Sequence, residues 1–270
     1  QHIIDALSEK YGIDKSQITK GDNYNSNSVI HFGDIKDTKL SLLGKDRGKT
    51  RDLSFSKLKV VYGSINVNSQ EWTNFDHTKV TTKADLSSLE LVYGDLIINT
   101  YITELNSLKE VTGHLSITDS QVSLDNLEKV GLSFAMRNVR GGDALKLGTI
   151  GQFANFSNWN GNVPKLTKVD GGMMVEDWTG EAPTLETVGE GLDIVYYNGA
   201  LPSLKTVNGH LSTKNRTQGF PKLEHVGRTA KFIGMKGDVP LLKTIGRDAN
   251  FESWEGNAPL LETIGGEAMF

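Results

Sequence analysis

A glycine-containing segment near the start of the chain, residues 44–50, is the first candidate for chemistry, because it ends in Lys49-Thr50 as a phosphate-binding loop does. Such a loop needs four residues between its two glycines and a helix after the Lys-Thr pair. Here three residues separate Gly44 from Gly48, and the residues that follow have the pattern of a strand. We therefore interpret the segment as a solvated basic turn.

The types and positions of the residues do not favour a metal site or a catalytic nucleophile. Cysteine is absent, so disulfides, thiolate nucleophiles and thiolate metal sites are excluded. A metal site needs side chains that converge; His114 and His210 share a repeat position but lie five repeats apart, or ~24 Å at the spacing of strands. Carboxylates are plentiful, and a pair of them for glycoside cleavage stays open. We predict no metal site, no cofactor and no catalytic residue.

A 19-residue repeat organises most of the chain. Each proline after the first follows the previous one by one repeat, and columns of leucine, of valine or isoleucine, and of glycine, asparagine or aspartate keep step with the prolines. The proline column is Pro164, Pro183, Pro202, Pro221, Pro240 and Pro259. The leucine column continues backwards through Leu147, Leu127, Leu108 and Leu89 to Leu58, where an insert near residues 70–83 lengthens one unit.

Each column predicts part of a coil. Leucine and valine would point inwards, and the alternation that follows them, as in Leu192 and Ile194, is typical of a short strand. The glycine, asparagine or aspartate column would provide a left-handed turn. We predict a mainly β, single-domain parallel β-solenoid of about ten or eleven 19-residue coils with a short N-terminal helical cap.

The charged residues after the core leucines test this prediction independently. They alternate in sign on both sides of a neutral gap, which makes sense only if residues one repeat apart are neighbours, because opposite charges then attract and like charges are kept apart. The column is Lys59, Glu90, Lys109, Glu128, Gly148, Thr167, Glu186, Lys205, Glu224, Lys243 and Glu262.

The pattern Leu-x-x-Leu-x-x-Val-x-Gly-x-Leu-x-Ile, present at 105–117 and in part at 86–98 and 185–194, resembles the leucine-rich-repeat family. The likeness is to its short β-rich bacterial and phage variants and to receptor-L-type solenoids, and it covers about four fifths of the chain by the extent of the repeat. The unit is shorter than usual and lacks the asparagine ladder. The resemblance implies binding partners and no shared chemistry.

Residues 1–45 fall outside the repeat, and residues 46–270 form the predicted solenoid. Ile3, Leu7 and Tyr11 follow a helical step, which favours a helix that caps the first coil. The alternative is the tail of a preceding domain. The chain begins with Gln1 and ends inside a repeat at Phe270, so we expect it to be part of a longer chain or assembly.

Two surfaces are candidates for binding. The outward strand positions vary between coils while the core columns repeat, which favours a partner-binding face at Met174, Glu176, Val195, Tyr196, Lys214, Lys231 and Ile233. A column of large side chains is either a sealed corner of the core or an exposed stripe for sugars or a protein. This aromatic column contains Trp159, Trp178, Tyr197, Arg216, Met235 and Trp254.

These observations predict a non-enzymatic binding or scaffolding solenoid whose partner is another protein. The alternative is a structural or adhesive component of a phage particle or bacterial surface that recognises a glycan or receptor, and a polysaccharide-active β-helix enzyme is a third hypothesis. The net charge of −4 argues against nucleic acid, and no apolar run is long enough for membrane insertion. A chain without cysteine suits a reducing cytosol or a virion, and a bacterial surface stays open.

Overall fold

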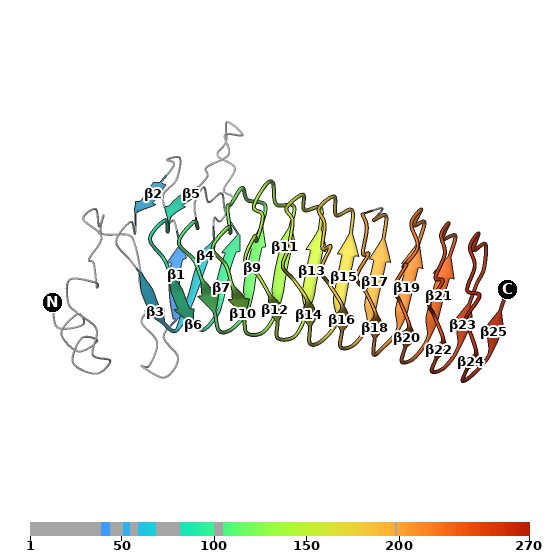
Figure 1. The fold of residues 1–270 in the computed structure, drawn as a ribbon. Helices are drawn as coiled ribbons and strands as arrows, with labels where there is room; N and C mark the ends of the chain where they lie inside the picture. The colour runs from blue at the N-terminus through green and yellow to red at the C-terminus, as the bar shows by residue number, and fades with distance from the viewer. Residues whose placement is uncertain (1–38, 44–50, 55–58, 69–81, 100–104, 198) are drawn as a thin grey trace, which may run out of the picture.

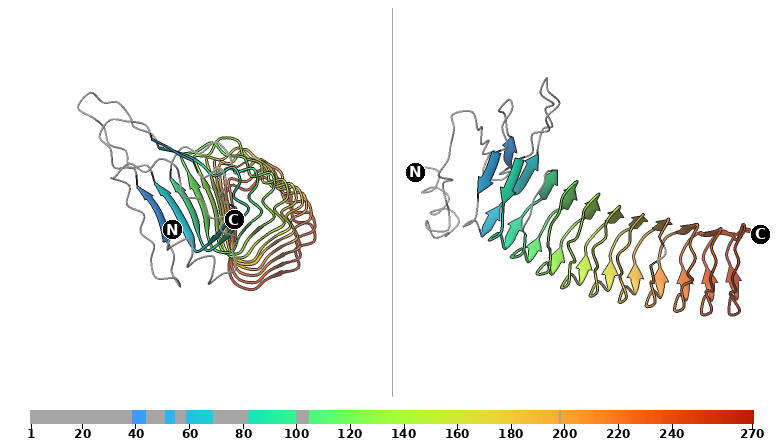
Figure 2. Two further views of the ribbon diagram at one scale, coloured as in Figure 1. Left: turned by 90° about the vertical axis from the view of Figure 1, so that its left-hand side faces the viewer. Right: turned by 90° about the horizontal axis from the view of Figure 1, so that it is seen from above.

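The computed structural model describes residues 39–43, 51–54, 59–68, 82–99, 105–197 and 199–270, and all regular structure in them is β-strand. The strands form two large parallel sheets, of 12 and 11 strands, and a separate pair, β2 (Arg51–Ser54) with β5 (Thr82–Asp85). Coils stack side by side into an elongated array (Figure 1) that bends along its length (Figure 2). The predicted parallel β-solenoid is therefore confirmed.

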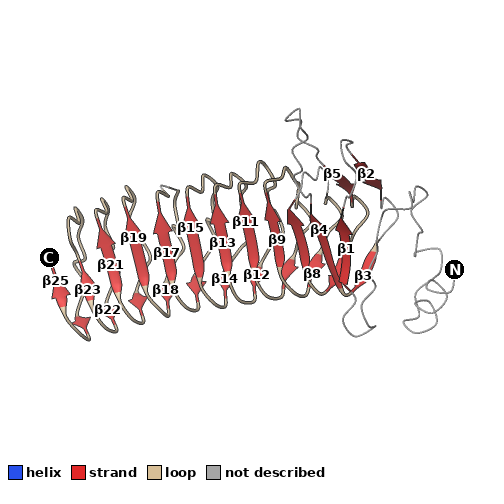
Figure 3. Cartoon of the chain, turned by 180° about the vertical axis from the view of Figure 1, so that it is seen from behind, coloured by secondary structure: helices blue, strands red, loops and turns tan. Residues whose placement is uncertain are grey.

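The 12-stranded sheet takes one strand from each coil, and these strands are seen face on in Figure 3. Most of them contain four residues, of which the first and third are buried. In array order they are β1 (Lys39–Leu43), β4 (Ser64–Asn68), β7 (Leu96–Asn99), β9 (Leu115–Thr118), β11 (Phe134–Arg137), β13 (Ala154–Ser157), β15 (Met173–Glu176), β17 (Leu192–Val195), β19 (Leu211–Lys214), β21 (Ala230–Ile233), β23 (Ala249–Asn250) and β25 (Ala268–Met269).

The 11-stranded sheet covers the other side of each coil with strands of two or three residues. Its strands hold the valine or isoleucine column that the sequence placed in the core. In array order they are β3 (Val60–Tyr62), β6 (Leu91–Tyr93), β8 (Glu110–Val111), β10 (Lys129–Val130), β12 (Thr149–Ile150), β14 (Lys168–Val169), β16 (Thr187–Val188), β18 (Thr206–Val207), β20 (His225–Val226), β22 (Thr244–Ile245) and β24 (Thr263–Ile264).

The strand register follows the repeat arithmetic. Leu192 pairs with Leu211, which lies one repeat later, and Leu211 pairs with Ala230 after one further repeat. Ile65 pairs with Leu96 across a longer stretch of sequence, so the additional residues near 70–83 are inserted within one unit. Residues one repeat apart are thus neighbours in space, which was the physical basis of the fold prediction.

Proline lies at a tight corner between the two sheets. In the coil of Pro202, the amide of Leu204 donates to the carbonyl of Leu201 at 3.3 Å, which closes a turn with proline at its second position. Proline suits that position because its ring fixes φ near the required value. Leu201 and Leu204 are both fully buried, so the turn also directs two side chains into the core.

The prediction of left-handed backbone in the glycine, asparagine or aspartate column is wrong. Close packing against the backbone of the preceding coil explains the glycines instead. None of the described residues in this column has a positive φ. A Cβ at Gly227 would lie against the backbone carbonyl of Asn208 in the preceding coil, closer than side chains tolerate. The left-handed residue follows the long strand instead, as at Asn215 with φ 55°.

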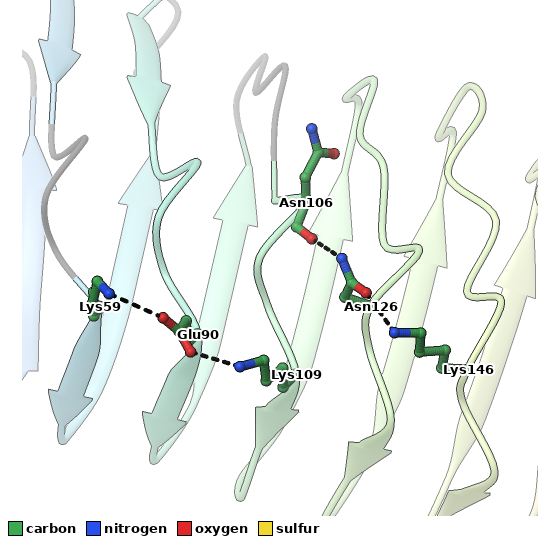
Figure 4. A network of polar contacts seen from close by, with 6 residues as sticks. All are labelled: Lys59, Glu90, Asn106, Lys109, Asn126 and Lys146. Carbon is green, nitrogen blue, oxygen red and sulfur yellow. Dashed lines mark hydrogen bonds and ion pairs between the residues drawn. The ribbon is translucent and has the colours of Figure 1, made fainter.

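The alternating charged column lies along one corner, as the sequence predicted. The amide of each residue donates to the carbonyl of its neighbour one coil earlier, from Glu90 to Lys59 through to Glu262 to Lys243. The Lys109 ammonium lies 2.7 Å from one Glu90 oxygen and the Lys59 ammonium 3.5 Å from the other (Figure 4). The Lys109 hydrogen bond, reinforced by the two lysine charges, lowers the pKa of Glu90.

The N-terminal predictions fall largely outside the described residues. The expected helix around Ile3, Leu7 and Tyr11 and the turn at 44–50 lie outside the described residues. Within the segment 1–45, β1 pairs with β4 and so extends the 12-stranded sheet. Within the described part of the chain, no helix has the length and apolar character required to span a bilayer.

Candidate binding surface

The seven residues of the predicted partner-binding face lie on or beside the outer side of the 12-stranded sheet. In β15, Met173 and Val175 point into the core, so Met174 and Glu176 point outwards. The same alternation turns Val195 outwards from β17 and Lys214 from β19. Lys231 and Ile233 of β21 also lie outside, and Tyr196 directly follows β17. We call this side of the sheet the outer face.

Strand pairing arranges the outer face into two columns. The last residues of the long strands form one column, in which Val195 lies between Glu176 and Lys214. The second residues form the other, in which Asp193 lies between Met174 and Ser212. Because both columns follow the strand register, successive residues within each column are separated by the distance between neighbouring strands, ~4.8 Å.

A third column borders the outer face where the chain leaves each long strand. Its residues adopt left-handed backbone, with φ between 48° and 60° from residue 119 to residue 253. We call it the shoulder, and its members are Asp119, Asn138, Asn158, Asp177, Tyr196, Asn215, Gly234 and Ser253. Asparagine, aspartate and glycine visit this conformation most readily, so the coil geometry accounts for most of these residue types.

Tyr196 is the exception in the shoulder. Its φ is 51° and its side chain is 53% exposed, although a bulky residue is disfavoured in left-handed backbone. Asp177 and Asn215 occupy the equivalent positions in the neighbouring coils. Neither core packing nor backbone preference accounts for a tyrosine here. Its signal in the sequence is a single aromatic residue in a column of small polar ones.

Hydrogen bonds connect side chains of neighbouring coils along the shoulder and on the outer face. The Asn138 amide donates to Asp119 at 3.0 Å, and the Asn158 amide donates to Asn138 at 3.2 Å, which makes a short side-chain ladder along the shoulder. On the sheet itself, His210 Nε2 lies 3.1 Å from Asp193 Oδ2. A similar ladder joins Lys146 to Asn126, whose amide donates to the Asn106 carbonyl at another corner (Figure 4).

The aromatic column is a sealed corner of the core and does not form an exposed stripe. Trp159, Trp178 and Tyr197 are at most 2% exposed, and only Trp254 near the end of the array is half-buried. The rings stack from coil to coil, with centroids 6.0 Å apart for Trp159 and Trp178 and 4.9 Å apart for Trp178 and Tyr197. Each indole N–H of these three tryptophans donates to a backbone carbonyl at 2.9 Å.

Arg216 continues the aromatic column as a fully buried cation. Its guanidinium lies 5.3 Å from the centre of the Tyr197 ring and 4.7 Å from that of Phe220. One nitrogen donates to the Tyr197 carbonyl at 3.2 Å, whereas Nε and Nη2 lack partners, as does the Tyr197 hydroxyl. Burial lowers the pKa of Arg216 to about 10 and raises the pKa of Tyr197.

A shallow hollow of about 350 Å³ lies at the proline corner near the coil of Arg216. Its wall contains Pro202, Pro221 and Pro240, together with Gln218 and Asp238. The Asp238 carboxylate already accepts from the Asn257 backbone and side chain, at 2.9 and 3.2 Å. This carboxylate in the wall of the hollow is thus already engaged within the chain.

The histidines do not meet one another where the structure describes them. The backbone amide of His114 donates a hydrogen bond to the Asp95 carboxylate. His225 Nδ1 lies 2.5 Å from Thr244 Oγ1. His2, His31 and His77 lie outside the described residues. Among the described residues, no group of three or more histidine and acidic side chains is arranged to hold a metal ion.

Comparison with known proteins adds no relative. No protein-family model matches the chain, and searches of curated proteins and of solved structures gave no significant match. What the fold defines is therefore a class, the parallel β-solenoid in which each coil corresponds to one sequence repeat.

Proposed function

We propose that this solenoid is a non-enzymatic binding or scaffolding protein that recognises another protein through the outer face around Tyr196. The observation that carries the proposal is the exposed tyrosine held in left-handed backbone at residue 196. Left-handed backbone costs an ordinary residue about 1–2 kcal/mol. Strained residues of this kind concentrate at functional sites, which favours a selected role for this side chain.

The surroundings of Tyr196 have the composition of a protein interface. Val195, Met174 and Ile233 are half-buried apolar side chains on the same face, while Lys214 and Lys231 are exposed. Interfaces combine an apolar centre containing aromatic anchors with a polar rim. Tyrosine also loses little conformational entropy when it is immobilised, because it has few rotatable bonds.

The architecture supports the same class of function. We propose a kinship of the repeat with leucine-rich-repeat solenoids, whose members present their sheets to partners; the support is the repeat pattern of residues 105–117. The glycan-binding alternative depended on an exposed aromatic column. Burial of Trp159, Trp178 and Tyr197 removes that support, so protein recognition is the function we propose.

Site-specific photocrosslinking tests the proposal. A benzoylphenylalanine in place of Tyr196 should give a discrete crosslinked protein adduct in extracts of the source cells. The same substitution at Tyr93, which is 48% exposed and lies in β6 of the opposite sheet, is the matched control. No adduct at 196, or an identical adduct from both positions, would show that the outer face is not the recognition surface.

Tyr196→Asn separates recognition from folding. Asparagine tolerates left-handed backbone, so the variant should be as stable as the wild type or more stable by about 1 kcal/mol. It should nevertheless fail to compete with the wild-type chain for the crosslinked partner. Thermal unfolding checks the first expectation and competition crosslinking the second. A variant that competes fully would contradict the role of Tyr196.

A further inference from the structure

The charges along the last-residue column of the outer face are antisymmetric about Val195. One coil to either side of Val195 lie Glu176 and Lys214, and three coils to either side lie Arg137 and Glu252. The intervening positions are uncharged. In array order the column is Arg137, Ser157, Glu176, Val195, Lys214, Ile233 and Glu252. Reversing the order of the coils therefore exchanges every positive charge for a negative one.

These charges are spaced so that they do not neutralise one another within the chain. An uncharged residue separates each from the next, which makes neighbouring charges ~10 Å apart at the strand spacing. At the corner of Glu90 and Lys109, opposite charges occupy adjacent coils and form ion pairs. Among the described residues, the ion pairs involve none of the four charged side chains of this column. All four charges are thus free of ion pairs within the described part of the chain and available to a partner.

We infer that the partner of the outer face is a second copy of this chain, packed face to face with its coils in reverse order. The inference rests on the proposed function of the face. A two-fold axis parallel to the strands and passing over Val195 places Glu176 opposite Lys214 of the second copy. The same operation places Arg137 opposite Glu252 of the second copy. A self-complementary patch is the requirement for a two-fold interface, and alternating charges fix its register.

Val195 and Tyr196 lie at the centre of this arrangement. Val195 and Tyr196 meet their own copies across the axis, so the exposed tyrosine gains an aromatic partner. Asp193 also lies near the axis, where two like charges would approach. Its carboxylate is already bonded to His210 of its own chain at 3.1 Å, so part of its charge is satisfied internally.

The size of the patch sets the strength of association. Seven coils span ~29 Å along the array and a four-residue strand ~13 Å across it, so the face covers on the order of 400 Å² per copy. That area, roughly 800 Å² for both copies together, is below the ~1,200 Å² that stable specific interfaces bury and is in the range of weak, transient contacts. The dimer is therefore a weak and reversible one, and the measurement must reach several hundred micromolar.

Sedimentation equilibrium of the full chain over that concentration range tests the inference. The wild type should show a monomer–dimer equilibrium. Glu176→Lys and Lys214→Glu, tested singly, should each weaken self-association at least tenfold, because each places like charges opposite one another twice. An equimolar mixture of the two variants should dimerise again, since both pairs are then of opposite charge. Glu190→Lys and Lys222→Glu, which make the same charge changes away from the face, are the controls.

Only a two-fold contact between copies predicts rescue by mixing. A chain that stays monomeric, or single variants that dissociate without rescue, overturns the second copy as the partner. Crosslinking of Tyr196 to a different protein would then still support the proposed function, so the two failures are distinguishable. Circular dichroism of each variant excludes unfolding as the cause of dissociation.

Discussion

The phenol ring of Tyr197 lies directly against the α-carbon of Gly199, so that any side chain at 199 would collide with ring atoms. Gly161, Gly180 and Gly256 stand in the same relation to the tryptophans two residues before them. Where Arg216 replaces the ring, Gln218 replaces the glycine. These glycines have no positive φ, so a turn does not require them. At Gly199 the three nearest atoms all belong to the Tyr197 phenol, whereas at Gly180 and Gly256 the carbonyl of the glycine one coil earlier lies closer still.

Gly199→Ala should therefore destabilise the wild type by about 1–3 kcal/mol, the usual cost of overpacking. In a Tyr197→Met background, which carries the side chain found at Met235 of the same column, the cost should fall below about 0.5 kcal/mol because the ring that causes the overpacking is gone. Denaturant unfolding of the four chains of this double-mutant cycle measures the coupling. Equal costs in both backgrounds would contradict the ring as the cause.

Arg216→Met should stabilise the protein at neutral pH by about 1–3 kcal/mol, because a buried cation with two unpartnered nitrogens is replaced by an apolar side chain. Burial lowers the pKa of Arg216 in the folded state to about 10, below its ordinary value of 12.5. Above pH 10 the unfolded chain thus binds more protons, and the wild type gains stability relative to the variant. Denaturant unfolding at pH 7 and at about pH 11 should show that the difference in stability between Arg216→Met and the wild type is smaller at the higher pH. A difference that increases with pH would contradict the lowered pKa of Arg216.

Gly227→Val should destabilise the array by more than about 3 kcal/mol, because its Cβ would meet the carbonyl of Asn208 in a backbone that cannot move away. Lys214→Ala, an exposed position on the outer face, should change stability by less than about 0.5 kcal/mol. Thermal unfolding of both variants makes the comparison. Similar melting temperatures would contradict the close packing of successive coils.

Lys205→Glu should place three glutamates in adjacent coils and remove the 3.1 Å ion pair with Glu186. We expect a loss of about 0.5–1 kcal/mol at low salt, since exposed ion pairs are weak. The loss should shrink toward zero at about 1 M salt, where charges are screened within a few ångströms. Lys222→Glu makes the same charge change at an exposed corner and is the control. A penalty independent of salt would point to a packing defect.

The sequence by itself determined the stacking of the coils, the core columns and the strand register. In a parallel array every residue meets the residue one repeat away, so periodicity in the sequence is contact in space. The ladder from Lys59 to Glu262 and the pairing of Leu192 with Leu211 followed from that arithmetic. The outward direction of Met174 and Val195 followed from alternation within strands.

Only the tertiary structure decided what happens at the corners, where alternation no longer tells which way a side chain points. The burial of Trp178, the crowding at Gly227 and the left-handed backbone of Tyr196 depend on how a corner packs against the coil before it. A column pattern records that residues are neighbours, but not whether a ring faces the core or solvent. That difference is set by packing between coils, and it removed the tryptophan column from the two candidate surfaces while leaving the face that contains Tyr196.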